Sequence, residues 1–288
     1  MVVPAANASL SGQWRTSWFL TPLNRNFPAG GLPAYPPMAA GNGSSGMPDD
    51  DVAAMLTGIY GSAVGCLVTA GGSGFASTTI DRPSYGYPGM FNFFDPDNFL
   101  TLSAVLGAGD PFLSRQVRRV LEQSGASISA TGQVPHHFEY GSAVFSALSG
   151  ATMPGPNSFW IRTCLRYAQY TGDLPWLRGY LPQMRHALGY LRSMVNSSVG
   201  LLRSSGSLFI DIFDRHGFTS DGNAMLIGLL EQFADAEEVG GSAAAAAQLR
   251  GEAAALRGHM EARLWARSDD HFVTALLDDN RTVYDMVD

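Results

Sequence analysis

Lysine is absent from this chain of 288 residues, so arginine supplies all 18 basic side chains. The arginines form no basic cluster, and a nucleic-acid-binding protein needs a basic stripe. Charged residues make up only 15% of the sequence, and the formal net charge is -7. No stretch approaches the roughly 20 apolar residues that span a bilayer. We therefore expect neither a nucleic-acid nor a membrane partner.

Cysteine is also scarce. Cys66 and Cys164 are the only two, and each lies in an apolar run, which favours buried free thiols over a disulfide or a metal pair. No cysteine or third ligand lies at metal spacing from His136 and His137, so no metal or cofactor is expected. The first ten residues lack the basic and apolar segments of a secretory signal. The sequence does not decide the cellular compartment, since four sequons permit glycosylation of a secreted form: Asn7, Asn42, Asn196 and Asn280.

Apolar residues are plentiful at 45%, and 33 glycines and 16 prolines indicate many loops around a sizeable core. Residues 1–48 are rich in Pro, Gly, Ala and Ser and predict an irregular N-terminal segment or linker before a domain at 49–288. Helical patterns cover residues 52–68, 98–124 with a break near 107–111, 158–170, 174–195, 221–239 and 243–265. Short extended segments are expected at 75–80, 207–213 and 271–276.

Helix pairs in series, joined by alternating short and long connections, predict an all-α fold. Such hairpins build either an α/α toroid or an α-solenoid. No sharp repeat of fixed period is visible, which weakens the solenoid interpretation. Long polar loops with Asp95, His136 and Asp211 follow alternate helices. In a toroid these loops gather at one end, where a site is expected.

Aromatic rings and carboxylates alternate in residues 91–99, directly before a helical run. Aromatic faces suit sugar rings, while carboxylates such as Asp95 and Asp97 bind hydroxyls or transfer protons. Asp97 has an equally good structural explanation, because Asp before an apolar run is a helix-start signal. The segment alone does not decide between sugar binding and capping.

Five segments in one order resemble the six-hairpin glycosidases, the (α/α)6-toroid enzymes that include trehalases, processing α-glucosidases and glycogen-debranching enzymes. The first is similar to their aromatic-Asp-x-Asp-x-Phe segment, and the others to a Gly-Asp-Pro turn, a Gly-Gln-Ile-Pro-His loop, a Thr-Gly-Asp helix junction and an Asn-Ala helix start. In this sequence they are residues 93–99, 109–111, 132–136, 167–177 and 221–226.

The resemblance implies a glycoside hydrolase that uses carboxylate acid/base chemistry, α-glucosidic and inverting, with a carbohydrate substrate and no cofactor. The family's general acid precedes the Asn-Ala helix, where Asp211 is the closest match and Asp214 the second; Ile210 and Ile212 replace the expected Trp. The substrate-binding residues it implies are Phe94, Asp95, Asp97, His136, His137 and Glu139. The two histidines equally suit simple turn chemistry, and an exposed loop role suits Glu139.

The resemblance also implies that the toroid is incomplete. A full toroid needs about twelve helices, and the sequence predicts six or seven. The family's general base lies in the last third of the toroid, beyond Asp288. We therefore expect a fragment that hydrolyses glycosides poorly and exposes an apolar surface through which it self-associates.

Two alternatives remain. The chain is either a truncated, non-catalytic relative that binds sugar or acts as a scaffold, or another α/α toroid such as a terpene cyclase or prenyltransferase. Acidic residues at 49–51 and 95–97 resemble cyclase motifs. The cyclase alternative leaves the segments at 132–136 and 171–173 unexplained.

Overall fold

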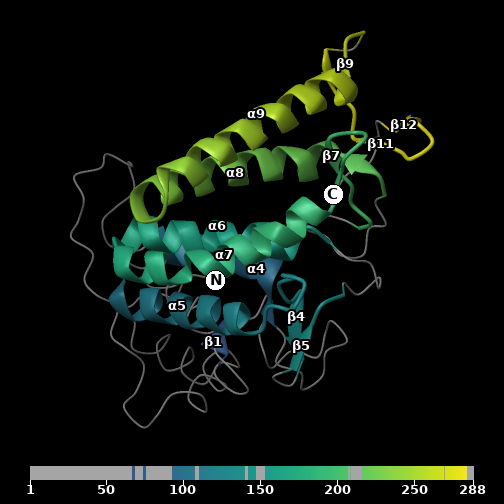
Figure 1. Cartoon of the computed structure of the whole chain (residues 1–288). Helices are drawn as coiled ribbons and strands as arrows, with labels where there is room; N and C mark the ends of the chain where they lie inside the picture. The colour runs from purple at the N-terminus through teal and green to yellow at the C-terminus, as the bar shows by residue number, and fades with distance from the viewer. Residues whose placement is uncertain are drawn as a thin grey trace, which may run out of the picture. The chain divides into compact units, whose positions relative to one another are not determined.

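The protein is described by a computed structural model that covers residues 67–68, 74–75, 93–107, 110–139, 142–146, 153–206, 208, 216–268 and 270–283 (Figure 1). Six helices occupy most of these residues, which confirms the predicted helical fold. They are α4 (Asp95–Gly107), α5 (Pro111–Ala126), α6 (Gly155–Thr171), α7 (Leu174–Ser193), α8 (Ser220–Gly240) and α9 (Ala243–Leu264). None of these described helices combines the length and apolarity needed to span a membrane.

The chain divides into two compact units, Met1–Val120 with Phe138–Ser142, and Leu121–His137 with Ala143–Asp288. The first unit holds α4, the start of α5 and short strands. Strands β1 (Leu67–Val68) and β2 (Gly74–Phe75) pair antiparallel, while β3 (Phe93–Phe94), β4 (His137–Glu139) and β5 (Ser142–Val144) form a sheet in that order. Residues 67–68 are thus a strand, which corrects the end of the helix predicted over 52–68.

A buried carboxylate starts α5. The Asp110 side chain accepts a 2.7 Å hydrogen bond from the Leu113 amide, and Pro111 occupies the first helical position. The first amides of a helix have no hydrogen-bond acceptor within it. Asp110 supplies an acceptor for one of them, and Pro111 has no amide proton that needs one. Leucine and valine side chains of α4 and α5 are fully buried and form the core of the first unit: Leu102, Val105, Leu106, Leu113, Val117 and Val120.

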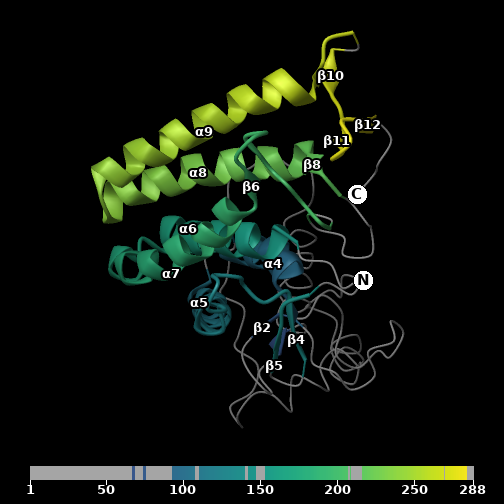
Figure 2. The same cartoon turned by 45° about the vertical axis from the view of Figure 1, so that its right-hand side comes forward.

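The second unit stacks two helical hairpins, α6–α7 and α8–α9 (Figures 1 and 2). Helix α8 contacts α6, α7 and α9 and lies at the centre. Its apolar face is correspondingly buried, with Leu229, Phe233 and Ala234 fully enclosed. Helices α6 and α8 run in the same direction, as the inner helices of a toroid do, since their C-terminal halves line one cavity.

Short strand pairs connect these helices. Strands β6 (Val195–Asn196) and β7 (Leu201–Leu202) follow α7, and β9 (Trp265–Ala266) pairs with β10 (His271–Phe272) after α9. Strand β11 (Ala275–Leu276) lies between β12 (Thr282–Val283) and β8 (Phe218–Thr219), which leads directly into α8. The segment predicted as extended at 271–276 is therefore two strands.

The predicted Thr-Gly-Asp junction between α6 and α7 is confirmed. Gly172 ends α6 in the left-handed conformation, with φ of 68°, which glycine adopts without a steric penalty. The Asp173 side chain then accepts a 3.1 Å hydrogen bond from the Trp176 amide and caps α7. The Trp176 ring stacks on Tyr180 at 4.6 Å, which anchors this first turn.

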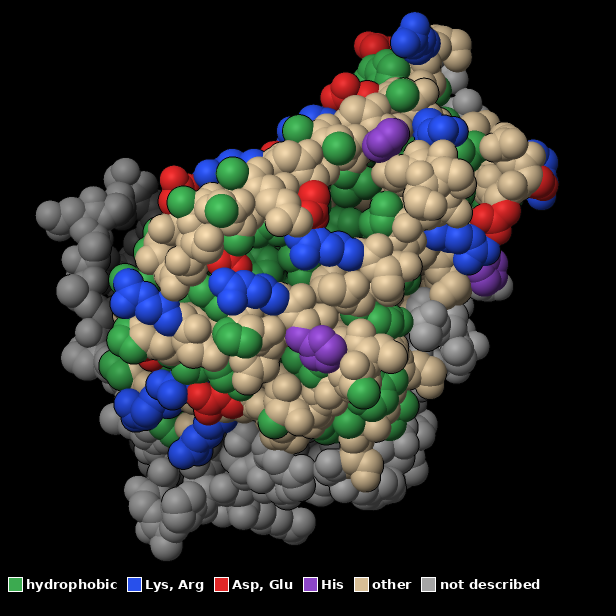
Figure 3. Space-filling view, viewed as in Figure 1, with side chains coloured by type: hydrophobic (Ala, Val, Ile, Leu, Met, Phe, Trp, Pro, Cys, Tyr) green, Lys and Arg blue, Asp and Glu red, His purple; other side chains and the backbone are tan. Residues whose placement is uncertain are grey.

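The second unit also contains a hollow between α7 and α9 with an apolar floor from α8. Figure 3 shows green apolar side chains in this hollow between charged ones. Leu226 and Leu230 lie on the floor, and the Arg192–Glu252 ion pair, 2.8 Å between nitrogen and oxygen, joins α7 to α9. A second ion pair, Arg185–Glu237 at 2.6 Å, joins α7 to α8, and its Glu237 side chain is buried.

The cysteine prediction is confirmed for Cys164, which is a fully buried free thiol on α6. Cys66, the linker at 1–48 and the extended segment at 209–213 lie outside the described residues. The large apolar side chains with substantial exposure in the described part lie in two places, Tyr170 and Val239 beside one cavity and Trp265 with Phe272 on the β9–β10 hairpin. Self-association through such surface stays a prediction.

Candidate active site

The aromatic and acidic segment forms a strand-to-helix junction. Strand β3 ends at Phe94, and α4 begins at Asp95. The half-buried Asp97 is therefore the third residue of α4, inside its first turn rather than before it. That position corrects the capping hypothesis, although an acidic group still interacts favourably with the helix dipole there. The side chains of Phe94 and Asp95 lie outside the described part of the structure.

The two histidines of the 132–137 loop form a buried pair in the second unit. His136 and His137 are only 2% and 3% exposed, and their Nδ1 atoms lie 2.8 Å apart with the rings at 88°. One Nδ1 must therefore donate a proton to the other. The accepting ring then carries its proton on Nε2, and the donating ring has a lone pair on Nε2. In a neutral pair one Nε2 is thus a donor and the other an acceptor.

Burial keeps His136 in its neutral form. Burial, together with the neighbouring His137, lowers the pKa of His136 to about 4. Removing an imidazolium from water is unfavourable, and a second positive charge on the adjacent ring adds repulsion. At neutral pH His136 is consequently an uncharged hydrogen-bonding group and a weak base.

A buried asparagine holds the histidine loop in place. The Asn157 side chain donates from Nδ2 to the carbonyls of Gly132 at 2.8 Å and Ala187 at 2.9 Å, and its Oδ1 accepts from the Val134 amide at 3.0 Å. Gly132 has φ of 90°, where a Cβ would lie 2.4 Å from the His186 carbonyl oxygen. Asn157 lies within the first turn of α6 rather than before it, and it binds the loop and α7.

A second buried asparagine, Asn223, binds the backbone of Leu202 in β7 in the same way. Asn223, in the first turn of α8, donates to the carbonyls of Leu202 and Thr219 and accepts from the Leu202 amide at 2.8 Å. Sequence reasoning missed this role, although an asparagine near the start of both α6 and α8 was visible. Asn98 holds the matching place in α4, but among the described residues neither polar atom of its buried side chain has a hydrogen-bond partner.

The loop that carries Asp211 and Asp214 is closed at its base by a backbone bridge. The Ser204 amide donates to the Gly217 carbonyl at 2.8 Å, and the Gly217 amide donates back at 3.0 Å. Gly217 has φ of 97°, and a Cβ there would lie 2.5 Å from the Leu276 carbonyl oxygen. The chain therefore leaves and returns at a fixed point just before β8 and α8.

The predicted site residues are only partly placed. Phe94, Asp95, Asp97 and Glu139 belong to the first unit and the two histidines to the second, and the Glu139 side chain is not described. Asp211 and Asp214 lie outside the described residues. The structure brings His136 and His137 together, whereas the predicted convergence of Asp95, Asp97 and Asp211 at one end of the helices stays a prediction.

Solved structures with the same helix arrangement include several enzymes of carbohydrate chemistry. A GH78 family rhamnosidase of Bacillus sp. GL1 matches 72% of this chain with a TM-score of 0.57 and 21% identity. The unsaturated glucuronyl hydrolase of Bacillus sp. GL1 matches 79% with a TM-score of 0.54 and 16% identity. Glucoamylase from Saccharomycopsis fibuligera matches 70% with a TM-score of 0.53 and 14% identity. The chain has the helical-hairpin fold of part of these (α/α)6 toroids.

The match to six-hairpin proteins is partial. The chain spans 20% of the rhamnosidase, 46% of the glucoamylase and 62% of the glucuronyl hydrolase. A sugar epimerase from a ruminal bacterium also shares the fold, with a TM-score of 0.55 and 13% identity over 78% of this chain and 59% of its own. No protein-family model matches the sequence, and no curated protein matches it. At these identities the likeness establishes the fold, and activity has to be argued from the residues.

Proposed function

We propose that this chain is a carbohydrate-active domain whose activity is hydrolysis of glycosidic bonds. The observation that supports it most is the shared fold with a rhamnosidase, a glucoamylase and a glucuronyl hydrolase. The Ser204–Gly217 bridge adds a second reason, because Asp211 and Asp214 belong to the segment whose two ends it joins, directly before β8 and α8. His136 and His137 supply ring nitrogens of the kind that bind sugar hydroxyls.

Asp211 serves as general acid in this proposal, and Asp214 is the second candidate. An acid must hold its proton at working pH until it protonates the leaving oxygen, which requires an environment that raises the carboxyl pKa. Phe94 offers a ring face to the sugar, while Asp95, Asp97, His136, His137 and Glu139 bind its hydroxyls. Inversion at an α-glucosidic bond further requires a second carboxylate about 6.5–9.5 Å from the acid, with water between them.

Sugar epimerisation is the second candidate function. The fold is shared with a sugar epimerase. Epimerisation next to a carbonyl starts with removal of a proton from carbon by a general base. His136 is a weak base at pH 7 because its pKa is lowered to about 4, so this function needs a base other than His136. Hydrolysis, in contrast, requires an acid and an activated water.

Proton NMR of sugar mixtures distinguishes these functions. The chain is incubated with maltose, isomaltose and p-nitrophenyl α-rhamnoside, and separately with free glucose and N-acetylglucosamine. Hydrolysis releases new reducing sugar, and the first anomeric signal to appear reports inversion or retention. Conversion of a free monosaccharide without bond cleavage favours the epimerase. Binding of a disaccharide with no turnover favours a non-catalytic relative, and absence of both binding and turnover contradicts the proposal.

A further inference from the structure

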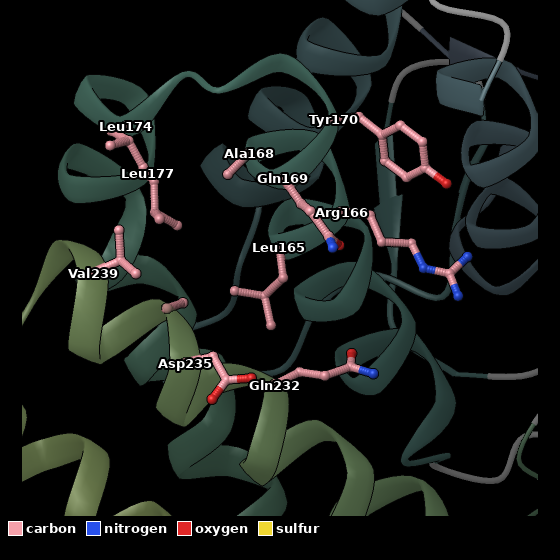
Figure 4. A pocket seen from close by; sticks show the side chains of 11 residues that line it. Leu165, Arg166, Ala168, Gln169, Tyr170, Leu174, Leu177, Gln232, Asp235 and Val239 are labelled. Atoms are coloured by element: carbon pink, nitrogen blue, oxygen red, sulfur yellow. The ribbon is translucent and has the colours of Figure 1, made fainter.

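A cavity of about 600 Å³ lies between the C-terminal halves of α6 and α8 and is closed at one side by the start of α7 (Figure 4). The residues that line it all belong to the second unit. Arg166, on its wall, is eleven residues beyond the first residue of α6, so the cavity lies roughly 16 Å along that helix from its N-terminus. It is therefore separate from the loops that precede α6 and α8. Its volume falls within the range of about 300–1,000 Å³ that is typical of small-molecule sites.

The charges on the wall of this cavity are balanced. Among the described residues that line it, Arg166 on α6 is the one cation and Asp235 on α8 the one anion. An ionic ligand would therefore meet a charge of its own sign on one wall, whereas a neutral ligand meets no repulsion. Hydrogen bonds from a neutral hydroxyl to a charged side chain are stronger than those to an uncharged one. The lining thus favours an uncharged ligand that carries hydroxyl groups.

Three side chains at the cavity keep hydrogen-bonding capacity for a ligand. Oε1 of Gln232 accepts a 3.3 Å hydrogen bond from Arg162, and Oδ1 of Asp235 accepts one of 3.0 Å from Arg250. Within the described part of the chain, Nε2 of Gln232, Oδ2 of Asp235 and the whole side-chain amide of Gln169 have no hydrogen-bond partner. These groups comprise donors from both amides and acceptors from Gln169 and Asp235. A sugar hydroxyl, which both donates and accepts, matches such a mixture.

An exposed aromatic ring completes the lining. Tyr170 is 58% exposed beside the cavity. In Figure 4 the Tyr170 ring and the Arg166 guanidinium extend from the same side of α6, with Gln232 opposite on α8. Such a ring gives a flat apolar face for the carbon side of a pyranose, and Leu165 and Leu177 add further apolar surface. The cavity therefore offers both a ring face and hydroxyl-binding groups, as a sugar unit requires.

We propose that the α6–α8 cavity is a second carbohydrate-binding site, which takes a neutral pyranose unit. Tyr170 stacks on the sugar ring, while the amides of Gln169 and Gln232 and the second carboxylate oxygen of Asp235 bind its hydroxyls. The inference rests on the proposed function only in that the ligand is a carbohydrate. Because the cavity is separate from the loops before α6 and α8, the site is able to hold sugar while the proposed catalytic end is occupied.

The test follows the side-chain amide NMR signals of Gln169 and Gln232 while the full chain is titrated with maltose, isomaltose and p-nitrophenyl α-rhamnoside in turn. The two signals are identified by their loss in Gln169→Glu and Gln232→Glu, so they report on this cavity alone. At least one sugar should shift both signals to saturation. Tyr170→Ala should weaken that binding about tenfold, because ring stacking is lost.

Two comparisons accompany this titration. Trp265→Ala removes an exposed aromatic ring away from the cavity and should leave the affinity unchanged, while thermal melts verify that each variant is folded. Methyl α-glucoside and methyl α-glucuronide, which differ only at C6, test the charge balance. We expect the charged glycoside to bind no more tightly than the neutral one.

Four outcomes overturn the inference. Amide signals that no sugar shifts remove the site, and an affinity that Tyr170→Ala leaves unchanged removes the assigned role of the ring. Tighter binding of methyl α-glucuronide shows an anion site. Signals that shift with protein concentration in the absence of sugar assign the cavity to a second copy of the chain. In every case the hydrolysis assay decides the proposed function independently, because it measures released products of the wild-type chain and not occupation of this cavity.

Discussion

Asn157 shows how one buried side chain determines the place of a whole loop. Its amide is fully buried and satisfies two carbonyls and one amide of the backbone that lie 23 to 30 residues away in sequence. A hydrocarbon of similar size fills the same space and leaves these three backbone groups without partners. Each unsatisfied buried group costs about 1–3 kcal/mol. The position of His136 and His137 depends on this residue, although Asn157 itself binds no sugar.

We expect Asn157→Leu to lower the free energy of unfolding by about 3 kcal/mol or more, since three buried hydrogen bonds are lost. Urea denaturation followed by circular dichroism measures the change. Gln248→Leu is the control, because Gln248 is exposed on α9, and it should change stability by less than about 0.5 kcal/mol. Equal stability of wild type and Asn157→Leu would contradict the role assigned to Asn157.

His136 makes stability depend on pH in a defined direction. Its pKa is about 4 in the folded protein against 6.5 for the free side chain, so below pH 6.5 the unfolded chain binds a proton that the folded protein does not. The contribution of His136 to the free energy of unfolding is therefore constant above about pH 6.5. Below that pH the free energy of unfolding falls, by about 3 kcal/mol in total at pH 4. Urea denaturation at pH 7.5, 5.5 and 4.5 measures this slope. His136→Gln should show a flatter profile than wild type; a profile of the same slope would assign the effect to other groups.

The Arg185–Glu237 ion pair, which joins α7 to α8, is less exposed at its carboxylate than the Arg192–Glu252 pair between α7 and α9. Glu237 is 1% exposed, and both of its oxygens accept from Arg185, at 2.6 and 2.7 Å. Glu252 is partly exposed in its pair with Arg192. Removal of Arg185 leaves the buried Glu237 carboxylate uncompensated, while water compensates both partners of the second pair. Burial, rather than the geometry of the pair, decides the energetic importance of each.

Glu237→Gln should therefore destabilise the protein by about 1.5–3 kcal/mol, because a charge-assisted hydrogen bond to a buried side chain is lost, whereas Glu252→Gln should cost less than about 1 kcal/mol. Arg185 holds the pKa of Glu237 below its usual value, so this contribution is present above about pH 4.5 and disappears as the pH falls through the folded-state pKa. Chemical denaturation of both variants at pH 7 gives the comparison. Equal losses in the two variants would refute the distinction.

The connection before α8 depends on one glycine. A Cβ on Gly217 would collide with the Leu276 carbonyl at 2.5 Å, and the φ of 97° is unfavourable for any other residue. Gly217→Ala should cost about 2–3 kcal/mol and displace the 205–216 loop. Gly228→Ala on α8 is the matched control, because nothing lies within 4 Å of its Cβ position and alanine stabilises a helix by about 1 kcal/mol. Thermal melts distinguish the two; a harmless Gly217→Ala would show that the loop base is adaptable.

At the scale of the whole molecule, helix periodicity and junction residues carried most of the information in the sequence. The Thr-Gly-Asp junction was predictable because a left-handed glycine and a capping aspartate act within a few residues of each other. The same holds for α8 and α9, whose predicted and observed bounds differ by only one residue at most ends. Such junctions are predictable because the residues that interact in them lie within a few positions of each other in the sequence.

Long-range contacts were not predictable in this way. The roles of Asn157 and Asn223 require loops more than 20 residues away, and an asparagine near a helix start looks like an ordinary cap. The two-residue strands form only where another segment pairs with them, and they are too short to show the alternating pattern of a strand in the sequence. The histidine motif indicated hydrogen bonding, but burial and the Nδ1 contact depend on how the loop folds onto α6 and α7.

The central claim, that the 205–216 loop supplies acid catalysis to a carbohydrate-active domain, is tested most directly by the turnover of Asp211→Asn. An amide keeps the shape of the carboxyl group but has no proton to give. In a version of the chain extended to the length of its solved relatives, kcat on a cleaved disaccharide should therefore fall at least about 100-fold in Asp211→Asn with sugar affinity nearly unchanged. Asp279→Asn, at an exposed turn, should retain the full rate. Full activity in Asp211→Asn with loss in Asp214→Asn would move the role to Asp214, and full activity in both variants would contradict the account.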